Sequence, residues 1–295
     1  MKLLALPRLA LAAVLLLPTG WTLFSGDPAV ALPLCRAAAQ APTHAPTSAP
    51  DLSGHDVCRA RPTSIQPVRQ ARPMPKSLAP ADTSGHYQHL GATTMSGWAG
   101  VMGRISVADP GVRKDTLDFT AARFMARQET ADGDTAWLEA GWAETGWAGG
   151  GRQRIYTYDT NRNAWTFFDD YAIKPGDRIW IYLQAESATE QGDTTWLAWL
   201  WWGDQWHLLA SQNLPISAAA TIEQYVEIYS ASNAPKSYTV PPVSFDNVQL
   251  LPTPGAPTQF WREDDVTSTA NQGSAPYCVT WLTRFDTWNA GDCIS

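Results

Sequence analysis

Hydrophobic and polar residues alternate in short runs through the middle of the chain, and this two-residue period predicts β-strands. The clearest run is 178–185, where Ile179 and Ile181 share one face while Trp180 and Tyr182 share the other. One face therefore packs on a core, and the other carries aromatic and polar groups. Further strands are expected at 100–107, 117–127, 135–142, 152–158, 195–202, 205–210, 220–229 and 240–250.

None of these runs has a sustained helical period, so helices are expected to be short or absent. About nine or ten short strands in one region are typical of two stacked antiparallel sheets. The run 196–202 is apolar on both faces, which predicts a central strand. We therefore expect an all-β fold, an antiparallel two-sheet sandwich of the jelly-roll or concanavalin-like kind.

The two ends of the chain differ in texture from this region. Residues 1–31 combine early basic residues with an apolar run and a small-residue stretch, which is typical of a secretory signal peptide. The apolar run is shorter than the roughly 20 residues a spanning helix needs, so we expect no membrane insertion. The rest divides into a Pro- and Ala-rich linker or propeptide at 32–85, the sandwich domain at 86–251, and an irregular C-terminal appendage at 252–295.

Cysteine usage and charge narrow the setting and the partners. The cysteines form two couples close in sequence, Cys35 with Cys58 and Cys278 with Cys293, which predicts two local disulfides in an oxidising compartment. No CxxC spacing occurs, so we expect no metal site and no cofactor. A formal net charge of −7 disfavours nucleic acid as a partner. The expected protein is a monomer that is secreted, extracellular or at the cell surface.

Two of the expected strands carry acids on the face turned away from the core. Alternation turns Glu139 outward in the strand at 135–142, and it turns Glu227 outward in the strand at 220–229. Two carboxyl groups a few ångströms apart share a proton and split their pKa values, so that one serves as base and the other as acid. Spacing alone favours the simpler alternative of two ordinary acids exposed on a polar face.

Sequence resemblance adds weight to the acid pair. The segment Trp137-Leu138-Glu139-Ala140-Gly141-Trp142 and the later Arg154-Ile155-Tyr156-Thr157-Tyr158 resemble the Glu-Ala-Gly-Trp segment and the following Arg-x-Phe-Thr-Tyr strand of the neprosin family. Residues 99–112 are similar to that family's opening strand and its Pro turn. The related eqolisin family is resembled by 173–179, a Gly-Asp strand entry, and by 225–248, the region of its catalytic Glu.

This resemblance implies a secreted glutamic endopeptidase that acts on polypeptides at acid pH. Glu227 would be the general base on water, and Glu139 the partner acid or oxyanion stabiliser. Neprosins place Gly-Gly before the second Glu, where this chain has Tyr225-Val226, so a non-catalytic relative stays open. The rings expected to contact substrate are Trp137, Trp142, Tyr156, Tyr158, Trp180, Tyr225 and Tyr229.

Other functions fit parts of the sequence. A glycan-binding or glycan-cleaving jelly roll would stack sugar rings of a polysaccharide on Trp137, Trp180, Trp199 and Trp202, and jelly rolls host both chemistries. A non-catalytic cell-surface sandwich is the third alternative. His207 lies in a Trp-rich strand without a GxSxG motif, so it is expected to pack or hydrogen-bond rather than to act as a catalytic base.

Overall fold

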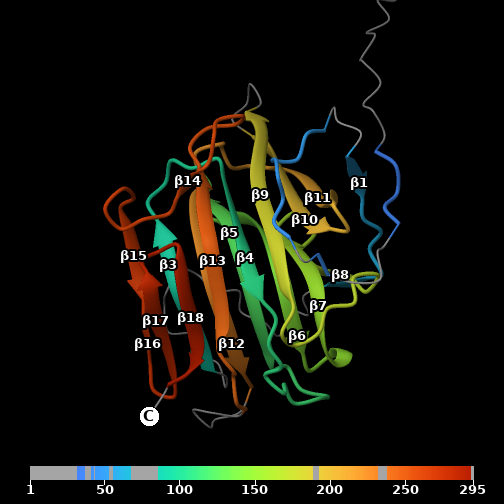
Figure 1. The fold of residues 1–295 in the computed structure, drawn as a ribbon, viewed down its shortest axis with the longest axis vertical. Helices are drawn as coiled ribbons and strands as arrows, with labels where there is room; N and C mark the ends of the chain where they lie inside the picture. Colours follow the sequence, from blue (N-terminus) through green and yellow to red (C-terminus); the bar gives the residue numbers. More distant parts are fainter. Residues whose placement is uncertain are drawn as a thin grey trace, which may run out of the picture. The chain divides into compact units, whose positions relative to one another are not determined.

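The computed structural model describes residues 32–36, 41–42, 44–52, 56–67, 86–188, 193–231 and 238–293. The described residues form β-strands and no helix, and the strands make two sheets that pack face to face (Figure 1). The prediction of an all-β sandwich is therefore confirmed. The segment predicted as a signal peptide lies outside the described residues. No helix capable of crossing a membrane occurs in the described part of the chain.

Ten strands form the first sheet, called sheet A. Its order is β1 (Val57–Arg59), β11 (Gln205–Leu214), β10 (Thr194–Trp202), β9 (Arg178–Ala188), β4 (Gly100–Ser106), β13 (Val243–Leu251), β18 (Thr287–Asp292), β17 (Tyr277–Thr283) and β16 (Gly273–Ser274), with β14 (Gln259–Phe260) paired to β13. The β1–β11 pair is parallel, and the other pairs of sheet A are antiparallel.

Eight strands form the second sheet, called sheet B, and all its pairs are antiparallel. Its order is β15 (Ser268–Asn271), β3 (His86–Thr94), β12 (Thr221–Ser230), β5 (Phe119–Glu129), β6 (Thr135–Thr145), β7 (Ala148–Asp159), β8 (Ala164–Phe168) and β2 (Ser64–Pro67). The nine runs expected from alternation each coincide with a strand. Within the expected sandwich domain, strands β3 and β8 were not predicted.

The main core lies between the two sheets and is built by the inward halves of the alternating strands. Phe124 on β5 meets Phe245 on β13 with ring centroids 5.6 Å apart, which joins sheet B to sheet A. Trp142 on β6 is also fully buried, and its indole N–H donates to the carbonyl of Ser106 on β4 at 2.9 Å. The sheets are therefore held by apolar contact and by a hydrogen bond that satisfies a buried polar atom.

The C-terminal residues differ from the expected irregular appendage, because they extend both sheets. Strands β17 and β18 form an antiparallel pair beside β13, and β15 pairs with β3. Trp288 on β18 is fully buried and stacks on Phe245 with ring centroids 4.3 Å apart. The large buried ring explains why this segment joins the core, although its alternation in sequence is weak.

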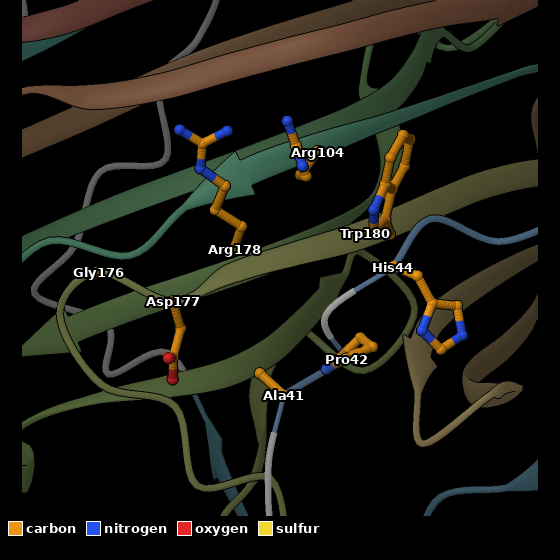
Figure 2. Close-up of a pocket in the computed structure, with 8 residues that line it drawn as sticks. All are labelled: Ala41, Pro42, His44, Arg104, Gly176, Asp177, Arg178 and Trp180. Atoms are coloured by element: carbon orange, nitrogen blue, oxygen red, sulfur yellow. The ribbon is translucent and has the colours of Figure 1, made fainter.

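The described part of the leader also contacts the sandwich rather than forming only a linker. Strand β1 adds to sheet A and β2 adds to sheet B. Between residue 36 and β1, His44 lies beside Trp201, and Ala41 and Pro42 line a hollow of about 290 Å³ with Arg104 and Trp180 (Figure 2). This segment therefore covers part of the outer face of sheet A.

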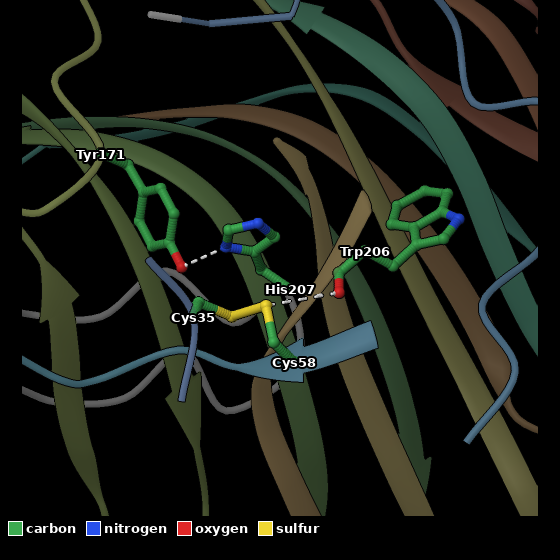
Figure 3. Close-up of a disulfide and its surroundings, with 5 residues drawn as sticks. All are labelled: Cys35, Cys58, Tyr171, Trp206 and His207. Carbon is green, nitrogen blue, oxygen red and sulfur yellow. Dashed lines mark hydrogen bonds between the residues drawn. A yellow bond between two sulfur atoms is a disulfide. The ribbon is translucent and has the colours of Figure 1, made fainter. Parts of the chain in front are cut away.

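Both predicted disulfides are present, Cys35–Cys58 and Cys278–Cys293. The first attaches the leader at β1, beside His207 on β11 (Figure 3). The hydroxyl of Tyr171 and Nδ1 of His207 share a 2.7 Å hydrogen bond, and burial lowers the pKa of His207 to about 4. His207 thus packs and hydrogen-bonds, as expected.

The packing between the sheets predicts a large effect for one buried ring. Phe124→Ala should lower the free energy of unfolding by about 3 to 5 kcal/mol, because a fully buried Phe leaves a cavity between two sheets. Phe260, which is 44% exposed, is the matched control and should change it by less than about 0.5 kcal/mol. Urea denaturation of the two variants measures the difference. Equal losses would show that Phe124 is not part of the core.

Candidate functional site

Five neighbouring strands of sheet B carry a cluster of ionisable side chains on the face turned away from sheet A. Strand pairing sets their positions: Glu227 on β12 lies opposite His89 on β3, and Tyr225 on β12 lies opposite Arg123 on β5. Arg123 in turn lies opposite Gly141 on β6. Residues far apart in the sequence are thereby brought into adjacent rows on one face.

The two acids expected as a pair are brought together, with an arginine between them. Nε of Arg123 lies 3.0 Å from Oε2 of Glu139 and 3.4 Å from Oε2 of Glu227. Both carboxylates thus contact the same nitrogen atom from strands on opposite sides of β5. Glu139 and Glu227 are far apart in the sequence. Both side chains lie on the outward face of sheet B, the face that alternation predicted for them.

Two further charges complete the cluster, which we call the carboxylate cluster: Arg123, Arg127, Glu139, Glu223 and Glu227. Oε2 of Glu223 lies 3.7 Å from Nη1 of Arg123, and Oε1 of Glu223 accepts a hydrogen bond from Nε of Arg127. At the other side, Nε2 of His89 lies 3.6 Å from Oε1 of Glu227. With three acids and two arginines, the carboxylate cluster carries a net charge of −1 when all five are ionised.

Small residues around Arg123 explain how a long side chain fits flat on the sheet. Gly141 directly opposite it has no side chain, and a Cβ there would collide with the carbonyl oxygen of Ala122. The next row runs from Glu227 through Ala121 and Ala143 to Arg154 on β7. This Gly and Ala surface leaves room for the guanidinium to lie between the two acids.

Burial makes the ion pairs of the carboxylate cluster strong and makes their separation costly. Arg123 is 3% exposed, and Glu139 and Glu227 are 5% and 7% exposed. Burial by itself would lower the pKa of Arg123, but the charges of Glu139, Glu227 and Glu223 outweigh it and raise that pKa. Arg123 is therefore permanently charged, and it favours the ionised form of its neighbours.

Tyr156 on β7 completes the surroundings of Glu139. Its hydroxyl donates to Oε1 of Glu139 at 3.3 Å. Burial and the negative charge of Glu139 raise the pKa of Tyr156 well above its usual value, so the hydroxyl stays a donor. Glu139 consequently contacts a donor at each oxygen, Arg123 at Oε2 and Tyr156 at Oε1.

Four of the other rings expected to contact substrate lie on this same face, around the carboxylate cluster. Tyr225 has its ring near the Arg123 guanidinium, 5.8 Å from centroid to Cζ, and hydrogen-bonds Thr93 at 2.5 Å. Trp137 is partly exposed and stacks on Tyr158, and Tyr229 stacks on Phe119. These rings form an aromatic border.

Trp142 and Trp180, expected among the same rings, lie elsewhere. Trp142 has the same parity as Leu138 and Ala140, so it faces the core while Glu139 faces outward. Trp180 belongs to sheet A, where it lines the hollow shown in Figure 2 with His44 and lies 5.8 Å from the Arg104 guanidinium. That hollow is separate from the carboxylate cluster.

The glycan alternative receives little geometric support from three of its four rings. Four rings were proposed to stack on sugars. Three of them lie on strands of sheet A and are buried: Trp199 and Trp202 fully, and Trp180 with 6% exposed. The group of three possible metal ligands found in the described residues is Cys35, Cys58 and His207. Its two sulfur atoms are joined as a disulfide, so they do not act as thiolate ligands.

Four members of this site were missed in the sequence: Arg123, Arg127, Glu223 and His89. Arg123 shares the outward parity of Met125 and Arg127 on β5, so alternation alone could have placed it outward. Its position between two acids depends on which strands neighbour β5 and in which register. That information comes from long-range pairing, and no local pattern carries it.

Comparisons with known proteins give limited similarity. No family model matches the sequence, and no curated protein matches it. Among solved structures, scytalido-glutamic peptidase with a transition-state analogue inhibitor is similar at 14% identity and a TM-score of 0.46, over 71% of this chain and 100% of that chain. The same peptidase with a peptide-based transition-state analogue gives 16% identity and 0.45 over the same shares.

A third similar structure is SCP-B, a member of the eqolisin family of peptidases, in a complex with the tripeptide Ala-Ile-His. It gives 15% identity and a TM-score of 0.43, over 71% of this chain and 100% of that chain. Similarity at this level leaves the activity of this chain open. The neprosin resemblance stays a prediction from the sequence.

The carboxylate cluster predicts a pH-dependent stability effect. Arg123→Met should lower the free energy of unfolding by about 3 to 5 kcal/mol at neutral pH, because it leaves buried carboxylates without their counter-charge. Those carboxylates then bind protons more readily in the folded than in the unfolded state, so the loss should shrink as the pH falls. Urea denaturation at several pH values measures this.

Arg127→Met is the control for that variant. The Arg127 side chain is 31% exposed and contacts Glu223 at the margin, so its loss should cost less than about 1 kcal/mol. If the two variants were equally stable at neutral pH, Arg123 would not be the charge on which the carboxylate cluster depends.

A separate acid at the end of β6 predicts a second pH effect. Glu144 accepts hydrogen bonds from the Val112 backbone N–H at 2.7 Å and from Gln153 at 2.6 Å, but burial raises its pKa from 4.5 to about 7. The folded protein therefore holds a proton that the unfolded chain releases, and stability falls as the pH rises through that window. Glu144→Gln should remove this slope in urea denaturation, whereas exposed Glu129→Gln should keep it.

Proposed function

We propose that this protein is a secreted hydrolase of peptide bonds that uses the Glu139–Glu227 pair. The observation that carries the proposal is the contact of both carboxylates with one buried nitrogen, Nε of Arg123. Burying three carboxylates beside one arginine costs desolvation free energy, and ionisable groups held at such a cost are enriched at functional sites.

Glu227 is the better placed of the two acids to act as general base. One of its oxygens contacts Arg123, while the other faces His89, whose side chain is 21% exposed. The ionised form that Arg123 favours is the form that takes a proton from water. The water oxygen then attacks the carbonyl carbon of the substrate, and the charge that develops on the carbonyl oxygen lies near a fixed positive charge.

Glu139 has a supporting role in this proposal. It holds Arg123 from the opposite side, and Tyr156 holds Glu139. The position of the guanidinium beside Glu227 therefore depends on Glu139. The partly exposed rings of Trp137 and Tyr225 border the carboxylate cluster and offer apolar surface to an extended polypeptide.

Hydrolysis of a denatured protein, followed by mass spectrometry from about pH 3 to 8, tests the proposal. Glu227→Gln should lower kcat by at least about 100-fold, because an amide cannot accept the proton from water. Glu139→Gln should be milder than Glu139→Ala, because its amide oxygen can still accept from Arg123 and Tyr156. Exposed Glu129→Gln is the control and should retain wild-type activity.

Activity of Glu227→Gln at the wild-type rate would contradict the assignment of the base. Retention on an insoluble polysaccharide without any proteolysis would instead favour the glycan-binding alternative.

A further inference from the structure

The proposed reaction needs a proton donor as well as a base. The leaving nitrogen of a peptide bond must receive a proton when the bond breaks. In a carboxyl pair that shares a proton, the second acid supplies it. Here Glu139 is a poor supplier, because Arg123 contacts its Oε2 and Tyr156 donates to its Oε1. Both contacts stabilise the ionised carboxylate.

His89 and Arg123 contact different oxygens of the Glu227 carboxylate, Oε1 and Oε2 respectively. Strand register places the two residues directly opposite each other on β3 and β12, with Nε2 of His89 3.6 Å from Oε1 of Glu227. The His89 side chain is 21% exposed, against 10% for Glu227 and 4% for Arg123. A substrate approaching this face therefore reaches His89 more easily than Glu227 or Arg123.

One acid and two aromatic rings lie beside His89. Glu227 faces it from β12, and Tyr225 on the same strand presents its ring edge-on at 5.8 Å between centroids. Tyr87 on its own strand stacks parallel at 5.9 Å. The neighbouring strand β15 carries Ser, Thr, Ala and Asn, none of which titrates in the accessible range. Burial raises the pKa of Tyr225, so that ring stays neutral.

We propose that His89 is the proton donor of the hydrolytic reaction and works with Glu227 as a proton-transferring pair. This inference rests on the proposed function and adds a catalytic residue to it. Imidazole is suited to the role because it can hold and release a proton in the range of about pH 5 to 8.

The proton balance closes with these two groups. Glu227 takes one proton from water as the water oxygen bonds to the carbonyl carbon, and the carbonyl π electrons move to oxygen. When the tetrahedral intermediate collapses, the C–N bond breaks, and the nitrogen keeps the electron pair and takes the proton of the His89 imidazolium. Protonated Glu227 then returns its proton to neutral His89, a transfer that their proximity favours. The products are a carboxylic acid and an amine.

The test compares His89→Gln with His86→Gln over the full pH range on the denatured protein that the wild type cleaves. His86 is the matched control, because it lies on the same strand, is exposed and pairs with Ser230 rather than with Glu227. His89→Gln should lower kcat about 100-fold with a smaller change in KM, and should abolish the loss of activity at high pH that marks deprotonation of the imidazolium. His86→Gln should match the wild type in both respects.

His89→Gly supplies a second readout that a structural role would not produce. Imidazole added to the solution should restore part of its activity in a concentration-dependent way, and circular dichroism should show the same fold as the wild type. A wild-type kcat and pH profile in His89→Gln, or no imidazole response in a folded but impaired His89→Gly, would overturn the role of His89 alone. No hydrolysis by the wild type at any pH would overturn the proposed function and this inference together.

Discussion

The site depends on the burial of one positive charge, Arg123, within a sheet face that carries three acids. A buried guanidinium is tolerated only when ionised partners lie within a few ångströms, and a buried carboxylate has the converse requirement. Glu139, Glu223 and Glu227 meet that requirement from the two strands that flank β5. The requirement is mutual, so strand register, ion pairing and the position of the proposed base are physically coupled. A one-residue slip of β12 against β5 would turn its acids into the apolar core.

The core on the other side of sheet B makes this arrangement possible. Alternation leaves the inward positions of β5 and β6 to residues such as Phe124 and Trp142, which anchor sheet B on sheet A. The outward positions are consequently available for charged residues. Gly141 and Ala143 have little or no side chain there, which leaves room for the long side chain of Arg123 to lie flat on the sheet. The same sheet therefore supports stability on one face and a dense charged group on the other.

Local sequence was sufficient for some of these features and insufficient for others. The two-residue period was enough for the nine central strands and for the outward orientation of Glu139 and Glu227, because both follow from backbone geometry. The same period did not predict that Trp288 brings the C-terminal strands into the core, because the burial of Trp288 depends on Phe245 in another strand. The role of Arg123 was likewise invisible, because β12 and β6 become its neighbours only through long-range pairing.

The arginine changes the chemistry expected of two adjacent carboxyl groups. Without a counter-charge, two such acids share a proton, one remains protonated, and that acid can serve as donor in acidic solution. With Arg123 between them, both can be ionised at once, which preserves a base but removes the internal donor. A third titratable group beside the base can then supply the donor. His89 contacts Oε1 of Glu227, whereas Arg123 contacts Oε2. The arginine between the two acids is therefore compatible with a base and its donor on the adjacent strands β12 and β3.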